Sequence, residues 1–544
     1  MTKTNLFMAA CLLTLAGCKG VDSTAHASTL KPEAAAPPAA QTTLVVAREQ
    51  VGNSLDIHGV GTNRPAYGTS WNVYDRLVSY GQKTLPDGQS MYDYRTIEPE
   101  LAERWQVTDE HITFQLRQDA TFHDGSPVTA NDVKWSFDRA LAIGGFPTFQ
   151  MKAGSLEKPE QFEVVDAHTF RVKLVRKDKL TLPDLAVPVA AVYNKKLALQ
   201  HATASDPWAQ EWLKNNDAGG GAYRIEKFEP GVQEVLARFD GWKSGPLPKM
   251  QRVVVRSVPS AATRRALIER GDVDMSFDLP PRDFAELAKL GQVKVQGVPV
   301  ENFMWYLDMN VKQKPFDDVR VRRALAAAIP YQEIYDRTCF GRCLALYGAS
   351  SSEPASLDWP QPFPNRTDLE RARALLAEAG LPNGFSTKLY FDLGLATWTE
   401  PIALLVQQSL RKIGVELTLE KVPGANWRGE MGKKSMPLLI NDMGGWLNYP
   451  DYFFFWNYHG QNAVFNTMSY QDAVMDRHIE SARFTDDPAL YEASVKAFIA
   501  RAMSETPRIP LYQANLDVAM KPALQGYRYW FHRQLDFRQL HKEN

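Results

Sequence analysis

Short strand-like runs alternate with capped helical segments from Thr43 onward, and this alternation constrains the fold more than any other feature of the sequence. Segments 43–48, 112–117, 169–175 and 252–258 are β-branched or alternate apolar and polar residues, as half-buried strands do. Because helical segments lie between them, and no fixed-period repeat or long coiled coil is visible, the sequence predicts a mixed α/β fold.

The helical segments carry recognisable start and stop signals. Segment 317–329 begins at an aspartate suited to an N-cap and stops before Pro330, and segment 368–380 begins and ends in the same way, with Gly380 at its end. Segment 261–271 also ends on a glycine. Segment 398–422 is a helical pattern that runs directly into a strand pattern.

Length and charge limit the number of lobes and the class of partner. At roughly 100 to 200 residues per domain, a chain of this length should contain two or three lobes. Lys and Arg together number 62 and Asp and Glu 63, which gives a net charge of -1 without a basic run. We therefore expect no nucleic-acid partner.

The N-terminus has the pattern of an export signal. Lys3 precedes an apolar stretch, residues 6–17, which is about half as long as the ~20 residues that cross a bilayer. It ends in Leu15-Ala16-Gly17-Cys18, which resembles the bacterial lipobox, so we expect residues 1–17 to be a lipoprotein signal peptide and Cys18 to be lipidated. The alternative is ordinary cleavage after Ala25-His26-Ala27, which lies well beyond the apolar stretch.

Residues 18–41 are rich in Ala, Pro, Ser and Thr and contain almost no large apolar side chain. Such a segment cannot bury enough surface to fold, so it predicts a flexible, lipid-anchored tether that spans on the order of 25 Å. We expect an exported protein that is held to a membrane through Cys18.

Two cysteines, Cys339 and Cys343, lie in the folded part of the sequence. An oxidising compartment favours a disulfide between them, and free thiols are the alternative. Zinc needs about four ligands, and no second Cys or His cluster accompanies the pair, so no metal or other cofactor is expected.

Two motifs resemble catalytic sequences but have simpler explanations. His123 and Asp124 lie in a tight Asp-Gly turn before a helix start at Thr129, and no nucleophile accompanies them. The glycines at 219–221 lack the Lys-Ser/Thr of a phosphate-binding loop. With no His-Glu-x-x-His or Gly-x-Ser-x-Gly either, the sequence does not predict an enzyme.

Segment 444–456, GGWLNYPDYFFFW, contains seven aromatic residues that do not alternate strictly. Its composition fits a buried core or the floor of a binding site, and the paired glycines would let another backbone approach closely, as an added peptide strand requires.

One long segment carries a family resemblance. Residues 97–137, IEPELAERWQVTDEHITFQLRQDATFHDGSPVTANDVKWSF, resemble the segment that marks bacterial extracellular solute-binding proteins, family 5, the dipeptide, oligopeptide and nickel group that delivers ligands to ABC importers. The similarity continues in family order through 219–223, 241–255, 266–275, 314–329, 368–380 and 507–513.

The resemblance implies an α/β type II periplasmic-binding-protein fold, in which two lobes are joined by a hinge and an additional subdomain is inserted. The first lobe would combine residues 42–66, 200–300 and 510–544, the inserted subdomain would cover 67–199, and the second lobe 301–509. Hinge closure would then bury a ligand between the lobes.

The resemblance also gives segment 444–456 a role. Family members commonly have Trp-x-x-Asp-Tyr-Pro-Asp-Pro here, and in peptide binders the first aspartate holds the ligand's α-ammonium group. This chain is one residue shorter, and Asn448 replaces that aspartate or the aspartate is deleted. The resemblance implies that Gly445, Trp446, Leu447 and Asn448 line the cleft, with the carboxylate of Asp451 nearby and residues 453–456 in the core.

Five further aromatic residues are candidates for ligand contact, because aromatic faces suit varied side chains; core packing is the alternative for them. They are Trp71, Tyr74, Trp305, Tyr306 and Trp398.

The expected function is the substrate-binding component of an ABC importer, a non-enzymatic and monomeric protein whose partners are a small solute and the permease subunits. Peptides are the leading ligand class, and the alternatives are an oligosaccharide, an opine-like compound or a nickel chelate. A remote alternative is a lipid-anchored envelope hydrolase that uses Asp442 and Asp451.

The neutral side chain at Asn448 yields a first prediction. If this position faces the ligand's amine, Asn448→Asp should increase the affinity for free-amine peptides relative to N-acetylated ones, because a desolvated ammonium group needs a charged acceptor. Isothermal titration calorimetry with matched peptide pairs measures the ratio of the two affinities. An unchanged ratio would contradict a position that faces the amine.

Overall fold

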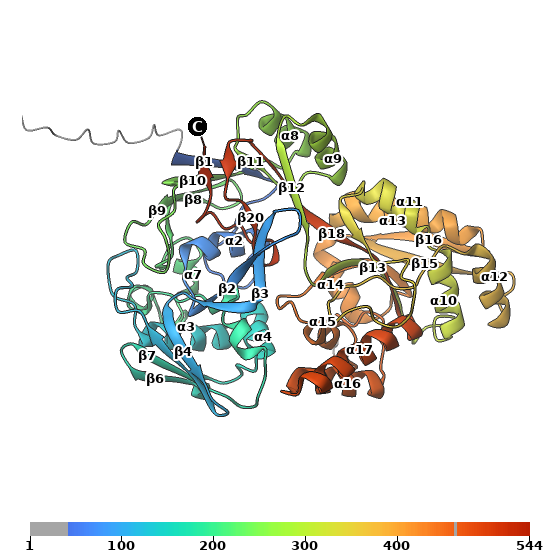
Figure 1. Cartoon of the computed structure of the whole chain (residues 1–544), viewed down its shortest axis with the longest axis horizontal. Helices are drawn as coiled ribbons and strands as arrows, with labels where there is room; N and C mark the ends of the chain where they lie inside the picture. Colours follow the sequence, from blue (N-terminus) through green and yellow to red (C-terminus); the bar gives the residue numbers. More distant parts are fainter. Residues whose placement is uncertain (1–41, 462–464, 544) are drawn as a thin grey trace, which may run out of the picture. The chain divides into compact units, whose positions relative to one another are not determined.

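The computed structural model describes residues 42–461 and 465–543 (Figure 1). The expected signal peptide at 1–17, the lipidation site Cys18 and the tether at 18–41 lie outside the described residues. Within the described ranges, none of the helices is both long enough and apolar enough to cross a membrane.

A long mixed sheet is organised around strand β18, Arg508–Met520. The first part of β18 pairs antiparallel with β13, Phe303–Met309, and its last part pairs antiparallel with β12 and β11. The sheet order is β16-β15-β17-β13-β18-β11-β1-β10-β9-β8, with β12 and β14 also paired to β18. The remaining bounds are β1 Thr43–Arg48, β8 Tyr223–Glu229, β9 Gln233–Arg238, β10 Arg252–Ser257, β11 Met275–Ser276, β12 Lys294–Pro299, β14 Cys343–Ala345, β15 Phe385–Asp392, β16 Val415–Val422 and β17 Leu438–Gly444.

Two smaller sheets occupy the first third of the described chain (Figure 1). One is the antiparallel sheet β4-β5-β7-β6, and the other is β2-β3-β20, in which β20 comes from the C-terminal region. Their bounds are β2 Val78–Thr84, β3 Ser90–Pro99, β4 Ala102–Val107, β5 His111–Leu116, β6 Phe162–Asp166, β7 Thr169–Lys173 and β20 Arg528–Tyr529, and a two-stranded sheet joins β19 Leu524–Gln525 to β21 His541–Lys542.

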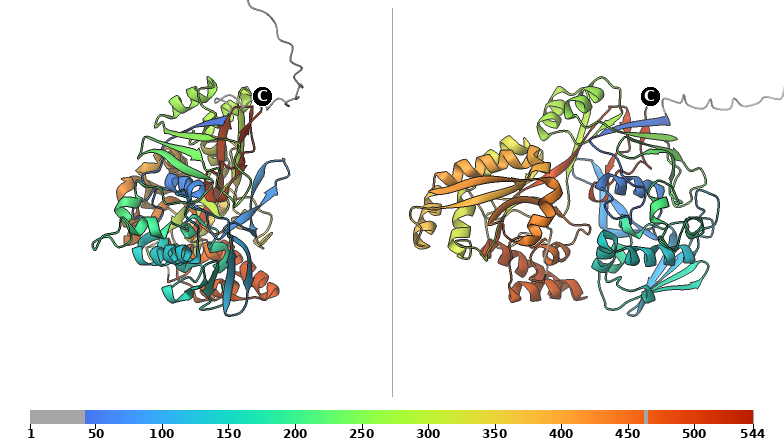
Figure 2. Two further views of the ribbon diagram at one scale, coloured as in Figure 1. Left: turned by 90° about the vertical axis from the view of Figure 1, so that its left-hand side faces the viewer. Right: turned by 180° about the vertical axis from the view of Figure 1, so that it is seen from behind.

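The helices cover these sheets and fill the connections between strands (Figures 1 and 2). They are α2 Arg64–Val73, α3 Ala130–Ile143, α4 Gly145–Ala153, α5 Thr181–Asp184, α6 Lys195–Leu199, α7 Gln210–Leu213, α8 Ala261–Glu269, α9 Pro281–Leu290, α10 Val319–Ala328, α11 Tyr331–Ile334, α12 Leu369–Glu378, α13 Ala396–Arg411, α14 Gly424–Lys433, α15 Pro450–Asn457, α16 Ala473–Phe484 and α17 Pro488–Glu505.

The local sequence signals are confirmed. All four expected strands form. The expected helices α8, α10 and α12 form as well, with side-chain caps at Ser260, Asp318 and Asp368. Helix α13 is followed by strand β16, as the pattern of segment 398–422 predicts. Helix α3 begins at a reciprocal cap, in which the backbone and hydroxyl groups of Thr129 donate to the Asp132 carboxylate. The mixed α/β prediction is therefore correct.

Both catalytic-looking motifs have structural roles. The His123 ring contacts the Asp217 carboxylate at 2.8 Å and the Gly221 carbonyl at 3.0 Å, so it holds the glycine loop in place. A Cβ atom on Gly219 would lie 2.1 Å from the Val73 carbonyl oxygen, so this loop needs glycine because another backbone passes close to it.

The buried side chains form three large hydrophobic cores. One core is built chiefly from residues 71–192, a second from residues 300–440 with 509–512, and a third from residues 44–74, 191–277 and 518–540. The expected division into a first lobe, an inserted subdomain and a second lobe stays a prediction. The first strand of the described chain, β1, lies close to its C-terminal end (Figure 2), and Lys542 Nζ donates to the Thr43 carbonyl at 2.6 Å.

A fully buried ion pair ties β13 to β18. Arg508 Nε and Nη2 donate to the two oxygens of Asp308 at 2.6 and 2.8 Å, and Arg508 Nη1 donates to Asn457 at 2.9 Å. The negative charge of Asp308 raises the pKa of Arg508 against the opposing effect of burial, so the pair stays charged.

We predict that Asp308→Asn lowers the free energy of unfolding by about 3 kcal/mol, because it leaves the Arg508 charge buried without its partner. Urea unfolding followed by tryptophan fluorescence measures the loss. The control is Asp358→Asn, which removes a solvent-exposed pair with Arg95 and should cost less than about 1 kcal/mol. Equal losses for the two variants would contradict a central role for the buried pair.

Candidate ligand-binding site

The aromatic segment 444–456 begins at the end of β17 and continues into α15. The backbone and the side chain of Asn302 hold the turn between them. The Gly445 N–H donates to the Asn302 carbonyl at 3.1 Å, and Asn302 Nδ2 donates to the Leu447 carbonyl at 2.7 Å. Residues 444–447 are therefore anchored to the connection between β12 and β13.

The paired glycines are needed for contacts within the protein. A Cβ atom on Gly445 would lie 2.4 Å from Asn302 Nδ2 and 2.8 Å from the Tyr452 ring. A Cβ atom on Gly444 would lie 2.9 Å from the His532 ring. The close approach that the sequence suggested for an added peptide strand is thus made, at these two positions, by the protein's own side chains.

Trp446 lies where three distant parts of the chain meet. Its half-buried ring has centroid distances of 5.1 Å to Tyr67 of α2, 5.0 Å to Phe146 of α4 and 5.0 Å to His532 near the C-terminus. The guanidinium carbon of Arg64, at the start of α2, lies 5.3 Å from the Trp446 ring centroid. This junction is the candidate ligand-binding site.

Three charged side chains interact at this junction, namely Arg64, Arg533 and Asp442. Among the residues that the structure describes, no ion pair within hydrogen-bonding distance joins either arginine to Asp442. Arg64 Nη1 makes one long hydrogen bond, 3.4 Å, to the His532 carbonyl. The Arg533 guanidinium lies 4.3 Å from the Phe303 ring centroid, and its Nε is buried without a hydrogen-bond partner in the protein.

The pKa shifts describe the surroundings of these groups. Burial and the neighbouring charge of Arg533 lower the pKa of Arg64 to about 10, and burial raises the pKa of Asp442 although both arginines oppose that rise. Arg64 nevertheless remains an exposed residue.

His532 completes the charged group as a neutral imidazole. Burial and the positive charges of Arg64 and Arg533 hold the pKa of His532 well below its usual range. Its Nε2 atom is buried and has no hydrogen-bond partner in the protein. The junction thus combines two cations, one carboxylate and a neutral ring that can donate or accept one hydrogen bond, according to its tautomer.

Several buried polar atoms in two segments have no hydrogen-bond partner in the protein, and two of these residues, His532 and Arg533, belong to the junction. Buried polar groups normally have partners, so such atoms are candidates for bonds to water or a ligand. In segments 301–302 and 528–534, the buried atoms of this kind are Glu301 Oε1 and Oε2, Asn302 Oδ1, Arg528 Nε and Nη1, Tyr529 OH, Trp530 Nε1, His532 Nε2, Arg533 Nε and Gln534 Oε1.

Ten residues were expected in the cleft or near it, and the structure places them in different surroundings. Trp446 lies at the junction, with Gly445 beside it and Asn448 half-buried two residues further on. Leu447 is fully buried in the core built chiefly from residues 71–192.

Four of the aromatic candidates lie in cores. The Arg76 guanidinium carbon lies 3.6 Å from the Trp71 ring centroid, and the Tyr74 ring lies 4.5 Å from that of Tyr193. Trp305 and Tyr306 are buried among the side chains of the second half of the chain. These positions favour the core-packing alternative that the sequence left open.

Trp398 is half-buried and packs against the core of residues 300–440. In segment 453–456, Phe453 and Phe454 are buried, as expected, whereas Phe455 and Trp456 are half-buried.

Asp451 lies in surroundings different from those of Asp442. It is fully buried in the first turn of α15, where one carboxylate oxygen lies 3.5 Å from Lys179 Nζ and 3.4 Å from the Tyr491 hydroxyl group. Burial raises the pKa of Asp451 against the effect of Lys179. The charges that act on Asp442 are those of Arg533, Arg64 and Asp392, so the two carboxylates do not share one site.

Side chains from residues 150–184 contact side chains from residues 451–483. The Tyr452 hydroxyl group donates to Gln150 at 3.2 Å, and Arg483 donates to the Ala153 carbonyl at 2.6 Å and to Asp178 at 3.0 Å. A recess of about 480 Å³, lined by Phe149 and Trp456 among others, opens beside these contacts. These bonds connect the expected inserted subdomain to the expected second lobe.

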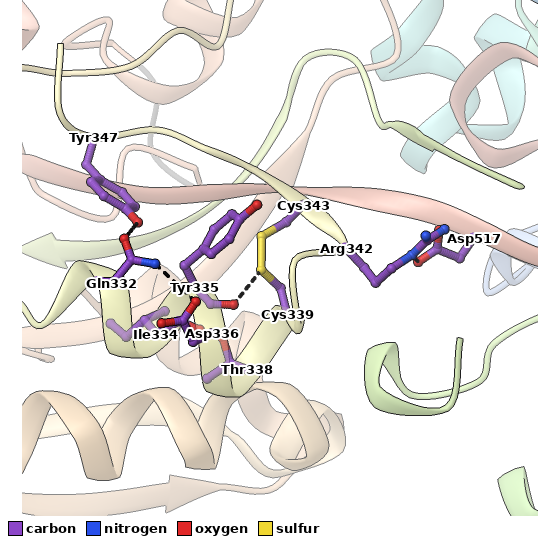
Figure 3. The surroundings of a disulfide bond; sticks show 10 residues. All are labelled: Gln332, Ile334, Tyr335, Asp336, Thr338, Cys339, Arg342, Cys343, Tyr347 and Asp517. Carbon is purple, nitrogen blue, oxygen red and sulfur yellow. Dashed lines mark hydrogen bonds and ion pairs between the residues drawn. A yellow bond between two sulfur atoms is a disulfide. The ribbon is translucent and has the colours of Figure 1, made fainter. Parts of the chain in front are cut away.

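Cys339 and Cys343 are joined in a disulfide (Figure 3). Arg342 lies between them in the sequence and forms an ion pair with Asp517 of β18 at 2.5 Å. Within the described part of the chain, no group of three or more His, Cys, Asp or Glu side chains is arranged to hold a metal ion.

Sequence reasoning missed the arginines and the histidine of the junction. Arg64, His532 and Arg533 lie in no motif, and Arg64 and Arg533 are separated by most of the chain. The one available signal was the Asn-Pro pattern around Arg64, which marks a helix start, but it says nothing of a ligand. Asp442 had been considered only for the remote hydrolase alternative.

This fold, in which β18 pairs with strands on both sides in one mixed sheet, is shared with solved structures of periplasmic binding proteins. The structure of the DppA protein of Helicobacter pylori in complex with the peptide STSA has a TM-score of 0.76 to this chain at 22% identity, covering 92% of this chain and 98% of that one.

The sequence comparisons define the family. The profile of bacterial extracellular solute-binding proteins, family 5 Middle, matches residues 96–465, and the chain belongs to this family. It is 29% identical to the probable D,D-dipeptide-binding periplasmic protein DdpA of Escherichia coli K12, over 84% of this chain and 86% of that protein. It is 28% identical to the glutathione-binding protein GsiB of Salmonella typhimurium, over 78% of this chain and 82% of that protein.

Glu301, which precedes β13, provides a pH-dependent prediction. Burial raises its pKa from 4.5 to about 8, so the folded protein holds this carboxyl group protonated at neutral pH, whereas the unfolded chain ionises it. Wild-type stability should therefore fall, relative to Glu301→Gln, as the pH rises from about 4.5 to about 8.

We expect Glu301→Gln to unfold at the same urea concentration as the wild type at pH 4 and to be more stable by at least about 2 kcal/mol at pH 8.5. Glu353→Gln, at an exposed position, is the control and should show no such trend. A stability difference that does not change with pH would show that Glu301 ionises normally in the folded protein.

Proposed function

We propose that this protein is the substrate-binding component of an ABC importer and that it captures peptides at the junction around Trp446. Membership in the family carries the transport role. The peptide class is supported by the two relatives, which are named for a D,D-dipeptide and for glutathione, itself a peptide. The protein acts by binding and delivery, without changing its ligand.

The geometry of the junction supports a closing mechanism. Trp446 and Asp442 belong to the part of the chain that follows β13, whereas Arg64, Tyr67 and Phe146 belong to the first 150 residues. A solute that touches both groups is held by side chains from both sides of the hinge. Its binding therefore favours the arrangement in which the two sides meet.

We further propose an exported, monomeric protein that is anchored by a lipid on Cys18 and faces the periplasm, where it meets the permease subunits. The support is the sequence pattern at residues 15–18, together with the DdpA relative, which is named as periplasmic. The alternatives for the ligand remain an oligosaccharide, an opine-like compound or a nickel chelate.

Native mass spectrometry of the protein, purified without refolding, tests this function directly. We expect the spectrum to show a bound mass or a ladder of peptide masses, because a closing cleft retains its ligand through purification. The denatured mass of the same sample should correspond to a chain that begins at Cys18 and carries a diacylglycerol.

A bound sugar or metal chelate would contradict peptide capture and leave the transport role standing. A substrate that the protein cleaves during incubation would contradict the transport role itself.

A further inference from the structure

Three consecutive charged residues lie between strand β7 and helix α5, and their signs alternate. They are Lys177, Asp178 and Lys179. Each of them contacts an opposite charge from the α15–α17 region of the chain. The three pairs are Lys177 with Asp486 at 3.3 Å, Asp178 with Arg483 at 3.0 Å and Lys179 with Asp451 at 3.5 Å. A positive, a negative and a positive charge on one side therefore meet a negative, a positive and a negative charge on the other.

The middle pair is the most deeply buried of the three. The Asp178 side chain is fully buried and the Arg483 side chain is 6% exposed. Arg483 Nη2 also donates to the Ala153 carbonyl at 2.6 Å, and the guanidinium carbon lies 5.1 Å from the Phe455 ring centroid. Arg483 belongs to α16, yet both of these acceptors belong to the expected inserted subdomain. A cation of the expected second lobe is thus neutralised from the other side.

Lys179 crosses the same contact in the opposite direction. Its Nζ atom donates to the Ala482 carbonyl and lies 3.8 Å from the Tyr491 ring centroid, in addition to its pair with Asp451. The charges that act on the buried Asp451 carboxylate are those of Lys179 and of the middle pair. The two inner pairs therefore form one balanced group of two cations and two carboxylates.

The neighbouring charges leave this balance intact. Arg176 pairs with Glu157 at 2.5 Å, and burial raises the pKa of Asp184 well above its usual range, which favours its neutral form. Asp109 also pairs with Lys177, at 2.9 Å. The extra negative charge of Asp109 lies at the exposed edge of the contact, where water and salt screen it.

We propose that residues 177–179, together with Asp451, Arg483 and Asp486, form a latch that closes the protein without a solute and fixes how its two sides meet. The two sides are the expected inserted subdomain and the expected second lobe. This inference goes beyond the proposed function, because it concerns the solute-free protein and does not depend on which solute is captured.

The latch acts through the arrangement of its charges as well as through their attraction. Opening returns these charges to water, so the desolvation cost of closing offsets much of the attraction within the pairs. Charge-assisted hydrogen bonds from Arg483 and Lys179 to carbonyl groups of the opposite side stabilise the closed state further. A displacement by one residue would place like charges opposite each other, so the alternating signs allow a single register.

The alternative is that these contacts only accompany a closure that a bound solute drives. In that case the solute-free protein would be open, and the removal of one latch charge would leave its open and closed populations unchanged. A latch predicts the reverse, because a lost charge leaves its partner buried and unpaired only in the closed protein.

Single-molecule fluorescence energy transfer measures the two populations. Dyes are attached to Val165→Cys and Val474→Cys in the mature protein, at exposed positions on β6 and α16. Cys339 and Cys343 are joined in a disulfide and take no dye. Unfolding, dialysis and refolding remove any bound solute, and native mass spectrometry confirms that none remains. We expect the closed population, with high energy transfer, to exceed the open one.

Variants of the labelled protein assign closure to the latch. Arg483→Gln and Lys179→Met should each lower the ratio of closed to open molecules at least about tenfold, because each leaves a carboxylate buried without its partner. Asp486→Asn, in the exposed pair, should lower it less than about fivefold. The double variant Lys179→Met with Asp451→Asn leaves neither charge buried. Its ratio should exceed the product of the two single effects by at least about threefold.

Arg477→Gln, at an exposed position on the same helix as Arg483, is the matched control and should behave like the labelled parent protein. Circular dichroism confirms that each variant is folded, and Lys179→Met decides the test if Arg483→Gln does not fold. A solute-free protein that is mostly open, or a ratio that neither Arg483→Gln nor Lys179→Met changes, would overturn the latch. Both results would leave peptide capture standing, because the mass bound to the protein before refolding tests capture separately.

Discussion

The pairing of β18 with strands on both sides is the constraint on which the rest of the structure depends. One strand of thirteen residues supplies hydrogen bonds to β13 and β14 with its first half and to β11 and β12 with its second half. The fully buried Arg508–Asp308 pair fixes its start against β13. The chain crosses twice between the strands paired to the first half of β18 and those paired to its second half. One crossing is β18 itself, and the other is residues 300–302, which lead from β12 into β13. Asn302, which anchors Gly445, lies in this second crossing.

Local signals made the fold predictable from the sequence. Caps such as Asp318 and Asp368 and alternating strands such as β5 depend on residues that are neighbours in the chain, so a single sequence contains the information that specifies them. The family resemblance supplied the architecture that these local signals cannot give. The prediction for Trp446 has the same source, because a sequence block marks its position.

The charged part of the candidate site could not be found by such means. Arg64, Asp442 and Arg533 come together only through the tertiary fold, and none of them lies in a pattern that differs from an ordinary surface residue. The aromatic candidates could not be separated from ordinary core residues by sequence, because both kinds of residue look alike there. A tryptophan that binds a ligand and a tryptophan such as Trp71, buried against Trp530 and Arg76, have the same local sequence character, and only burial separates them.

The proposed closing mechanism depends on which contacts between the two sides change with the solute. A ligand shifts a conformational equilibrium only by as much as it binds one state better than the other. Contacts such as Lys179 with Asp451 and Arg483 with Asp178 join the two sides through the protein alone, and they contribute the same stabilisation whatever solute is bound. Selectivity in closing must therefore come from groups that the solute itself bridges. In the proposed capture at the junction, a solute would have to contact both the Trp446 segment after β17 and the α2 and α4 side chains that pack against it, Tyr67 and Phe146, to couple its own chemistry to closure.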